Sequence, residues 1–165
     1  MKHQKISETE LSGIVTDICR QIVLSKWQPD YIVGIVRGGL VPAVMISQFL
    51  NVPMYALKIS LRDGIEDCES NCWMSEHAFE GKKILVVDDI NDTGATLNWL
   101  VKDWQGSAFS TSSEWDNIWG NNVRFATVVD NRSSQSKYKI DYVGLVINKF
   151  EEDTWIDFPW EGWWK

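Results

Sequence analysis

The sequence predicts an α/β protein with a doubly wound, mainly parallel sheet and flanking helices. Short apolar segments alternate with segments of helical periodicity along the 165 residues, which is the pattern of successive βαβ units. Two motifs with ligand-binding character, Arg37-Gly38-Gly39 and Asp88–Thr96, each begin where an apolar segment ends. Since ligands in such folds bind at the carboxyl ends of strands, these positions agree with the fold class. The chain has no repeat and no linker, so residues 1–165 are expected to form one domain.

The predicted elements alternate in order along the chain. The capping box Ser7-Glu8-Thr9-Glu10 begins an amphipathic helix that ends near Trp27. A helix from about Val41 to Leu50 carries a proline in its first turn, where proline is tolerated. A third helix is expected at Ala95–Trp104, and strands are expected at Tyr31–Val36, Met54–Ile59, Ile84–Val87, Phe125–Val129 and Tyr142–Val146.

Two long segments carry no clear element. Residues 61–81 are polar, acidic and weakly periodic, and a loop of that length is usually functional or mobile. This loop holds Cys68, Cys72 and His77, whose spacing matches no standard zinc pattern, so we expect loop residues rather than a metal cluster. The second segment, Gln105–Asn122, is interpreted as an irregular insertion.

The charge balance limits the classes of partner. With 16 basic against 23 acidic residues the net charge is −7, whereas a broad nucleic-acid surface usually carries the opposite sign. Phosphates would therefore be bound locally, by backbone N–H groups, one or two placed cations or a metal ion. The amino terminus lacks the apolar core of a signal peptide, and no apolar run is long enough to span a bilayer. We therefore expect a cytoplasmic protein without a membrane partner.

The segment ILVVDDINDTGATL, residues 84–97, joins carboxylates to a phosphate-binding turn. Thr93-Gly94-Ala95-Thr96 offers small residues and hydroxyls where a helix begins, and exposed N–H groups there suit a phosphate. Asp88 and Asp89 would repel that phosphate unless they face a sugar diol or Mg²⁺. A diol beside a phosphate describes ribose 5-phosphate. From the motif chemistry alone, a magnesium-holding aspartate pair of a phosphatase or nucleotide enzyme is the alternative.

Three segments together resemble type I phosphoribosyltransferases. VVDDINDTGATL resembles the phosphoribosyl-pyrophosphate motif of that family, and YIVGIVRGGLVPAVMISQFLNVPM resembles its pyrophosphate loop and helix. DTWIDFPWE resembles the carboxyl-terminal base-binding segment of the xanthine-guanine group. The resemblance implies a five-stranded parallel core, a small carboxyl-terminal hood at about residues 150–165, and a flexible loop at about residues 61–81. It also implies a homodimer or homotetramer.

The resemblance further implies an activity and a set of residues. The 5-phosphoribosyl group of phosphoribosyl pyrophosphate would pass to a purine base (guanine, xanthine or hypoxanthine) with Mg²⁺ as cofactor. Asp88 and Asp89 would hold the ribose hydroxyls, Asp89 would also contact the metal, and Asp92 would be the general base. A strained or cis peptide is expected at Val36-Arg37. The residues expected to bind the diphosphate substrate are Arg37, Gly38, Gly39, Asp88, Asp89, Asp92, Thr93, Gly94, Ala95 and Thr96.

For the base, the resemblance implies stacking on Trp155, with the backbone around Ile156 and Asp157 reading the far edge of the ring. Most of the ten tryptophans are otherwise expected to pack in the core or at a subunit contact. The family usually places a lysine after its fourth core strand, where this chain has Asp130 and Asn131. Asn131 can still donate a hydrogen bond to the base, whereas an aspartate would prefer a 6-amino group or a protonated ring nitrogen. Two alternatives therefore stay open: a sensor without turnover, or an enzyme for a pyrimidine or modified base.

Overall fold

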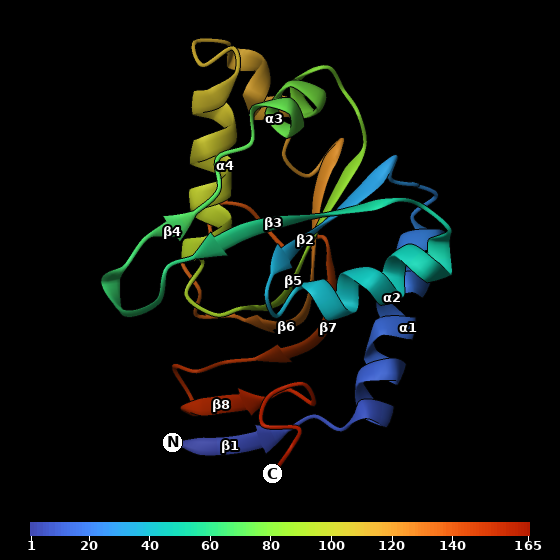
Figure 1. The fold of residues 1–165 in the computed structure, drawn as a ribbon, viewed down its shortest axis with the longest axis vertical. Coiled ribbons are helices and arrows are strands. Elements are labelled where there is room, and N and C mark those ends of the chain that lie inside the picture. Colours follow the sequence, from blue (N-terminus) through green and yellow to red (C-terminus); the bar gives the residue numbers. More distant parts are fainter.

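Two sheets organise the fold of the computed structural model, which describes residues 1–165 (Figure 1). The main sheet has the strand order β4-β3-β2-β5-β6-β7, and all neighbours are parallel except β3 and β4. Its strands are β2 (Tyr31–Val36), β3 (Met54–Ser60), β4 (Asp67–Cys68), β5 (Ile84–Asn91), β6 (Val123–Asn131) and β7 (Tyr142–Ile147). The doubly wound, mainly parallel sheet is confirmed, with the short antiparallel β4 added at its edge.

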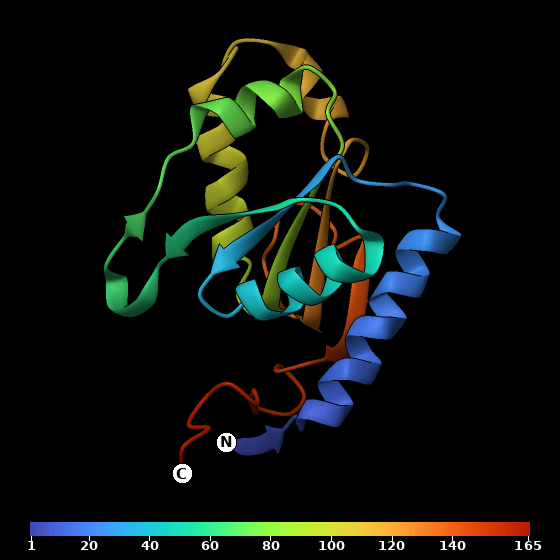
Figure 2. The same ribbon diagram turned by 45° about the vertical axis from the view of Figure 1, so that its right-hand side comes forward.

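Helices cover both faces of this sheet (Figure 2). On one face α1 (Glu8–Leu24) and α2 (Leu40–Leu50) pack against strand residues such as Ile32 and Leu85. The next residues along the same strands, Val33 and Val86, turn to the other face and meet α3 (Cys72–Phe79) and α4 (Ala95–Ser107). Because both faces are buried, β2 and the first half of β5 appear in the sequence as unbroken apolar runs.

The order of strands reverses at β2. From β2 the chain first adds β3 on one side and then crosses to add β5, β6 and β7 on the other. The carboxyl ends of β2 and β5 therefore lie next to each other at the point where the connections diverge, which is where such sheets bind ligands. The strand β5 continues to Asn91 instead of ending at Val87, because its ladder with β6 persists through Asp88, Ile90 and Asn91.

A second sheet, at the foot of the molecule in Figure 1, joins the two ends of the chain. Here β1 (Lys2–Lys5) pairs in parallel with β8 (Thr154–Asp157). The strand β1 was not predicted, since its residues are polar and mostly exposed and only the pairing with β8 makes them a strand. In the same hood Trp160 stacks on Phe158, with ring centroids 4.7 Å apart and planes 8° apart.

Residues 61–81 contain more structure than we predicted. A 3-10 turn at Arg62–Gly64 and the strand β4 form an exposed arm, but the segment then enters helix α3. Asn71 caps α3 by accepting a hydrogen bond from the N–H of Met74 at 3.0 Å, and Met74 and Ala78 are buried against the sheet. The helix has only eight residues, so its periodicity is too short to stand out in the sequence.

The segment Gln105–Asn122 is irregular in backbone but belongs to the core. The helix α4 extends to Ser107, and a 3-10 helix follows at Ser113–Asn117. Trp115 and Trp119 are buried and stack on each other with ring centroids 5.7 Å apart. They lie in the same buried cluster as Trp104, so packing accounts for these tryptophans.

Candidate active site

The largest concentration of predicted site residues surrounds a cavity of about 510 Å³ at the carboxyl ends of β2, β3 and β5. The lining combines the loop after β2, the end of β5 and the start of α4. The following predicted residues line it: Arg37, Gly38, Asp88, Asp89, Asp92, Thr93, Gly94, Ala95 and Thr96. Segments more than 50 residues apart in the sequence thus share one site.

The loop after β2 fits closely against the acidic pair. A Cβ at Gly38 would lie 1.9 Å from Asp89 Oδ2, and a Cβ at Gly39 would lie 2.5 Å from the carbonyl oxygen of Val87. Only glycine lets the backbone approach this near. Gly39 itself is buried and does not line the cavity. The Val36–Arg37 peptide is cis, one of the two forms the resemblance led us to expect.

Asp88 and Asp89 are adjacent in the second half of β5, and neither forms an ion pair with the cationic side chains of the cavity. Burial and the adjacent Asp89 carboxylate raise the pKa of Asp88 well above its usual range, and burial also raises the pKa of Asp89. Arg62 acts in the opposite direction on both. Two backbone N–H groups accompany the pair: that of Asp89 donates to Asp88 Oδ1 at 2.9 Å, and that of Ile90 donates to Asp89 Oδ1 at 2.8 Å. The free site therefore suits hydroxyl donors or a cation.

The turn at residues 92–96 presents the amino terminus of α4 to the cavity. Gly94 precedes the helix with a φ of 90° and has no side chain to cap it, while Thr93 Oγ1 accepts a hydrogen bond from the N–H of Ala95 at 3.2 Å. The first N–H groups of a helix have no acceptors within the helix, and its dipole adds partial positive charge. A Cβ at Gly94 would lie 2.3 Å from the backbone nitrogen of Ser136, so the turn is packed from behind by residues 135–136. These features are those of a turn that can bind an anion.

Asp92 belongs to a second group of polar residues at the rim. Its Oδ2 lies 2.9 Å from Lys149 Nζ, and its carbonyl oxygen accepts a hydrogen bond from Asn131 Nδ2 at 2.9 Å. The side chain of Asn131 is buried, and its Oδ1 accepts from the backbone N–H groups of Lys149 and Ser133. The amide of Asn131 thus braces this part of the protein and does not line the cavity.

The predicted base-binding segment lies in β8 and does not line the cavity. Lys149 connects it to the site, because its ammonium lies near the ring of Trp155 and pairs with Asp92. The ring of Trp155 is half exposed, and Lys149 Nζ lies 5.8 Å from its centroid. Ile156 is buried, and Asp157 Oδ2 lies 3.0 Å from His3 Nδ1 on β1. The strand pairing of the hood therefore holds Trp155 in place.

The carboxylate of Asp130 is directed to neighbouring protein groups. Its Oδ1 accepts a hydrogen bond from Asn91 Nδ2 at 2.8 Å, and the same amide contacts Ser134 and Ser136. Asp130 therefore stabilises the loop that packs against the turn at residues 92–96, and it does not line the cavity.

Three cationic residues and one serine at the site were not among the predicted site residues. Lys58, Ser60 and Arg62 line the cavity from the end of β3, and Lys149 follows the end of β7. Each lies at or just after the carboxyl end of a strand in the main sheet, where such folds bind ligands. The same rule predicted Arg37 from the sequence and could have predicted these residues.

The acidic pair offers two adjacent carboxylates for a metal ion. No group of three or more His, Cys, Asp or Glu side chains in residues 1–165 is arranged to hold one. Cys68 and Cys72 are free thiols, but they are not loop residues as expected, because Cys68 lies in β4 and Cys72 begins α3. None of the helices combines the length and apolar character needed to cross a bilayer.

Comparisons with known proteins agree with this geometry. Residues 6–161 match the model of the phosphoribosyl transferase domain. The xanthine-guanine phosphoribosyltransferase of Nitratidesulfovibrio vulgaris is 30% identical over 140 residues, which cover 84% of this chain and 73% of the relative. The xanthine-guanine phosphoribosyltransferase of Idiomarina loihiensis is 29% identical over 159 residues, which cover 94% of this chain and 85% of the relative.

The fold of the chain also matches that of a solved structure. The crystal structure of a purine phosphoribosyltransferase from Pyrococcus horikoshii matches with a TM-score of 0.68 and 21% sequence identity, covering 98% of this chain and 95% of that one. The family resemblance of the three sequence motifs is thereby confirmed. Because the family model spans most of its length, the chain belongs to the phosphoribosyl transferase domain family.

Proposed function

We propose that the protein transfers the 5-phosphoribosyl group of phosphoribosyl pyrophosphate to a purine base (guanine, xanthine or hypoxanthine). Pyrophosphate leaves and a nucleoside 5′-monophosphate forms. The observation that carries the proposal is the shared cavity of Arg37, the Asp88–Asp89 pair and the turn at residues 92–96. The purine and xanthine-guanine transferases among the similar proteins support a purine as the acceptor.

Different residues bind the phosphate, the ribose and the pyrophosphate of the substrate. The amino terminus of α4 and the hydroxyls of Thr93 and Thr96 bind the 5-phosphate. The carboxylates of Asp88 and Asp89 accept hydrogen bonds from the two ribose hydroxyls. Positive charge grows on the ribose as pyrophosphate leaves, so these carboxylates stabilise the transition state more than the ground state. Arg37 and the backbone beside Gly38 and Gly39 bind the departing pyrophosphate.

The acidic pair also fits Mg²⁺. Mg²⁺ is usually bound by one or two carboxylates together with substrate phosphates, and Asp89 is the carboxylate that borders the pyrophosphate loop. Burial raises the pKa of both carboxyl groups, so their charged forms are disfavoured in the free site, and a bound divalent cation would stabilise those charged forms. When bound, Mg²⁺ supplies positive charge to the leaving pyrophosphate.

The base is bound on the other side of the ribose. Trp155 offers an exposed ring face for stacking, and the backbone of Ile156 and Asp157 lies next to it in β8. The purine nitrogen that attacks the ribose must lose its proton, and the carboxylate of Asp92 at the rim is the base we assign to that step. We also infer that the protein assembles as a homodimer or homotetramer, which the exposed Val44 and Phe49 on α2 support.

The variant Asp89→Asn tests the proposal. It keeps the size of the side chain and removes the charge, so pyrophosphate release with guanine should fall by about 100-fold or more. The melting temperature serves as a control for folding. Unchanged turnover would refute the assignment of the acidic pair to the ribose. A wild-type protein that binds phosphoribosyl pyrophosphate but never turns over would favour a sensor.

A further inference from the structure

A lysine from the connection between β7 and β8 lies between the two groups we assign to the base. The ammonium of Lys149 contacts the carboxylate of Asp92 at 2.9 Å on one side. On the other side it lies 5.8 Å from the ring centroid of Trp155. Only 18% of the Lys149 side chain is exposed, so the position of the ammonium is fixed by the protein rather than by solvent.

The register of two strands explains how a lysine after β7 reaches this place. The strands β6 and β7 are parallel neighbours, and Asn131 at the end of β6 is opposite Ile147 at the end of β7. Lys149 follows two residues later, and its backbone N–H donates to Asn131 Oδ1 at 3.0 Å. Asn131 occupies the position where the family resemblance predicted a lysine, but its buried amide holds the backbone of the lysine that comes from the next strand.

We propose that Lys149 is the specificity-determining donor of the base site and that it donates a hydrogen bond to the 6-oxo group of a purine stacked on Trp155. This inference rests on the proposed function. An ammonium group has three N–H donors and no acceptor, and Asp92 is the one protein side chain that takes a hydrogen bond from it. A 6-oxo group accepts a further hydrogen bond from this ammonium, whereas a 6-amino group presents N–H donors and is rejected.

The other groups at the rim agree with this choice of base. Asp130, which could have attracted a 6-amino group, is hydrogen-bonded to Asn91. The amide of Asn131 donates to the carbonyl oxygen of Asp92 and accepts from the backbone N–H groups of Ser133 and Lys149. Lys149 is thus the charged donor that remains for a base in contact with Trp155.

Hypoxanthine and adenine provide the comparison, because they differ in the group at position 6. In Lys149→Met the kcat/KM for hypoxanthine should fall by roughly 10- to 100-fold, the scale of a lost hydrogen bond to a charged group. The kcat/KM for adenine should stay or rise. Lys149→Gln, which keeps a neutral donor, should lie between Lys149→Met and the wild type. The matched control is Lys102→Met, at an exposed lysine on α4 that does not line the cavity, and it should change neither value.

Two results would overturn the assignment. An equal loss for both bases would mean that Lys149 acts only through Asp92 and does not contact the base. No loss for either base would mean that the ion pair with Asp92 is structural.

A binding experiment separates failure of this inference from failure of the proposed function. Calorimetry with inosine 5′-monophosphate, adenosine 5′-monophosphate and ribose 5-phosphate requires no turnover. We expect Lys149→Met to weaken the binding of inosine 5′-monophosphate by roughly tenfold or more and to leave the binding of the other two ligands unchanged. If that loss is seen while the wild type releases no pyrophosphate, the inference stands and the transfer reaction fails. If the wild type turns over but the variant binds all three ligands as the wild type does, the inference fails and the transfer reaction stands.

Discussion

At the scale of single residues, the site depends on how closely a glycine loop approaches a carboxylate. A Cβ at Gly38 would stand 1.9 Å from Asp89 Oδ2, far inside van der Waals contact. The carboxylate can occupy its place at the mouth of the cavity only while residue 38 has no side chain. The motif Arg37-Gly38-Gly39 could be recognised from the sequence, but the identity of its contact partner could not.

Gly38→Ala should therefore move the Asp89 carboxylate and reduce turnover. A displacement of about 1 Å in such a site costs roughly 100-fold in rate, and pyrophosphate release measures it. The control is Gly13→Ala on α1, where an added Cβ meets no atom within 4 Å. This control should keep full activity and gain up to about 1 kcal/mol of stability, because alanine is the better helix former. Full activity in Gly38→Ala would contradict the assigned position of Asp89.

The buried charge of Asp88 should appear in the pH dependence of stability. Burial and the adjacent Asp89 carboxylate raise the pKa of Asp88 above its ordinary value of 3.8. The ligand-free fold therefore favours the neutral carboxyl over the carboxylate. The neutral form contributes its full stabilisation of the folded protein below the ordinary pKa. The effect is lost as the pH rises through the folded-state pKa.

Asp88→Asn removes this titration while keeping the shape of the side chain. Without ligand, its melting temperature should be close to that of the wild type near the ordinary pKa of an aspartate. Towards neutral pH the variant should become the more stable protein by a few degrees, even though it loses activity. Thermal melts of both proteins across this range measure the difference. A variant that is less stable than the wild type at every pH would contradict the buried-charge account.

Lys149 illustrates what the sequence could not provide at this scale. Asp88, Asp89 and the turn at residues 92–96 are contiguous, so their chemistry could be inferred from one segment. Lys149 and Asp92 are 57 positions apart, and their contact depends on the register between β6 and β7. No local pattern encodes that register. The sequence therefore led us to Asn131, which the fold uses as a brace.

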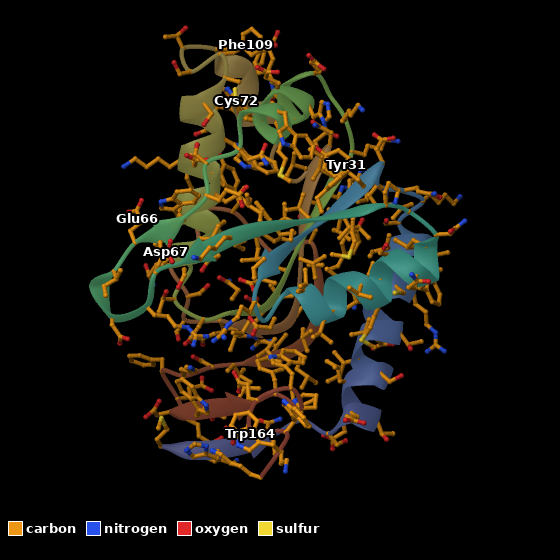
Figure 3. All side chains as sticks on the ribbon, viewed as in Figure 1. Tyr31, Glu66, Asp67, Cys72, Phe109 and Trp164 are labelled. Atoms are coloured by element: carbon orange, nitrogen blue, oxygen red, sulfur yellow. The ribbon has the colours of Figure 1, made fainter.

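At the scale of elements, the least predictable parts are those that depend on contacts with distant segments. The strand β1 is polar and exists through its pairing with β8, and helix α3 is short and held by buried contacts. The apolar strand β2 and the helix α1, with its capping box, follow from local sequence and were predicted closely. Figure 3 places Trp164 in the hood near these paired ends, and its ring, like that of Trp163, is largely exposed.

The arm formed by the 3-10 turn and β4 is the element best placed to close over the substrate. Figure 3 labels Glu66 and Asp67 on this arm, which projects from the body of the protein. Trp99 Nε1 on α4 donates to Glu66 Oε1 at 2.9 Å, and Lys58 pairs with Asp67. Arg62 lines the cavity from the arm. The arm is therefore tethered by a few surface contacts while one of its residues faces the site.

We predict that phosphoribosyl pyrophosphate with Mg²⁺ orders this arm. Closure would exclude water from the charged ribose centre. Trypsin cleavage after the exposed Arg62 should fall sharply when the ligand is added. Cleavage after Lys26, at the opposite edge of the main sheet, should not change and provides the internal control. Equal cleavage at Arg62 with and without ligand would count against a lid.

At the scale of the whole molecule, two buried clusters pack on opposite faces of one sheet and support the strands whose ends form the site. Each cluster combines alternate residues of the same strands with a different pair of helices. The tryptophans of residues 105–122 complete one of these clusters, so the segment is part of the scaffold. Alternation of strands and helices was enough to predict this architecture. The added strand β4 and the pairing of the two chain ends depend on tertiary contacts that no sequence period reports.

The transfer reaction itself tests the central claim most directly. Wild-type protein is incubated with phosphoribosyl pyrophosphate, Mg²⁺ and one base at a time: guanine, xanthine, hypoxanthine, adenine or uracil. Pyrophosphate is measured, and the nucleotide product is identified by its mass. We predict pyrophosphate and nucleoside 5′-monophosphate in equal amounts with the 6-oxopurines, and little of either with adenine or uracil. Absence of product with every purine, or product with uracil alone, would contradict the account.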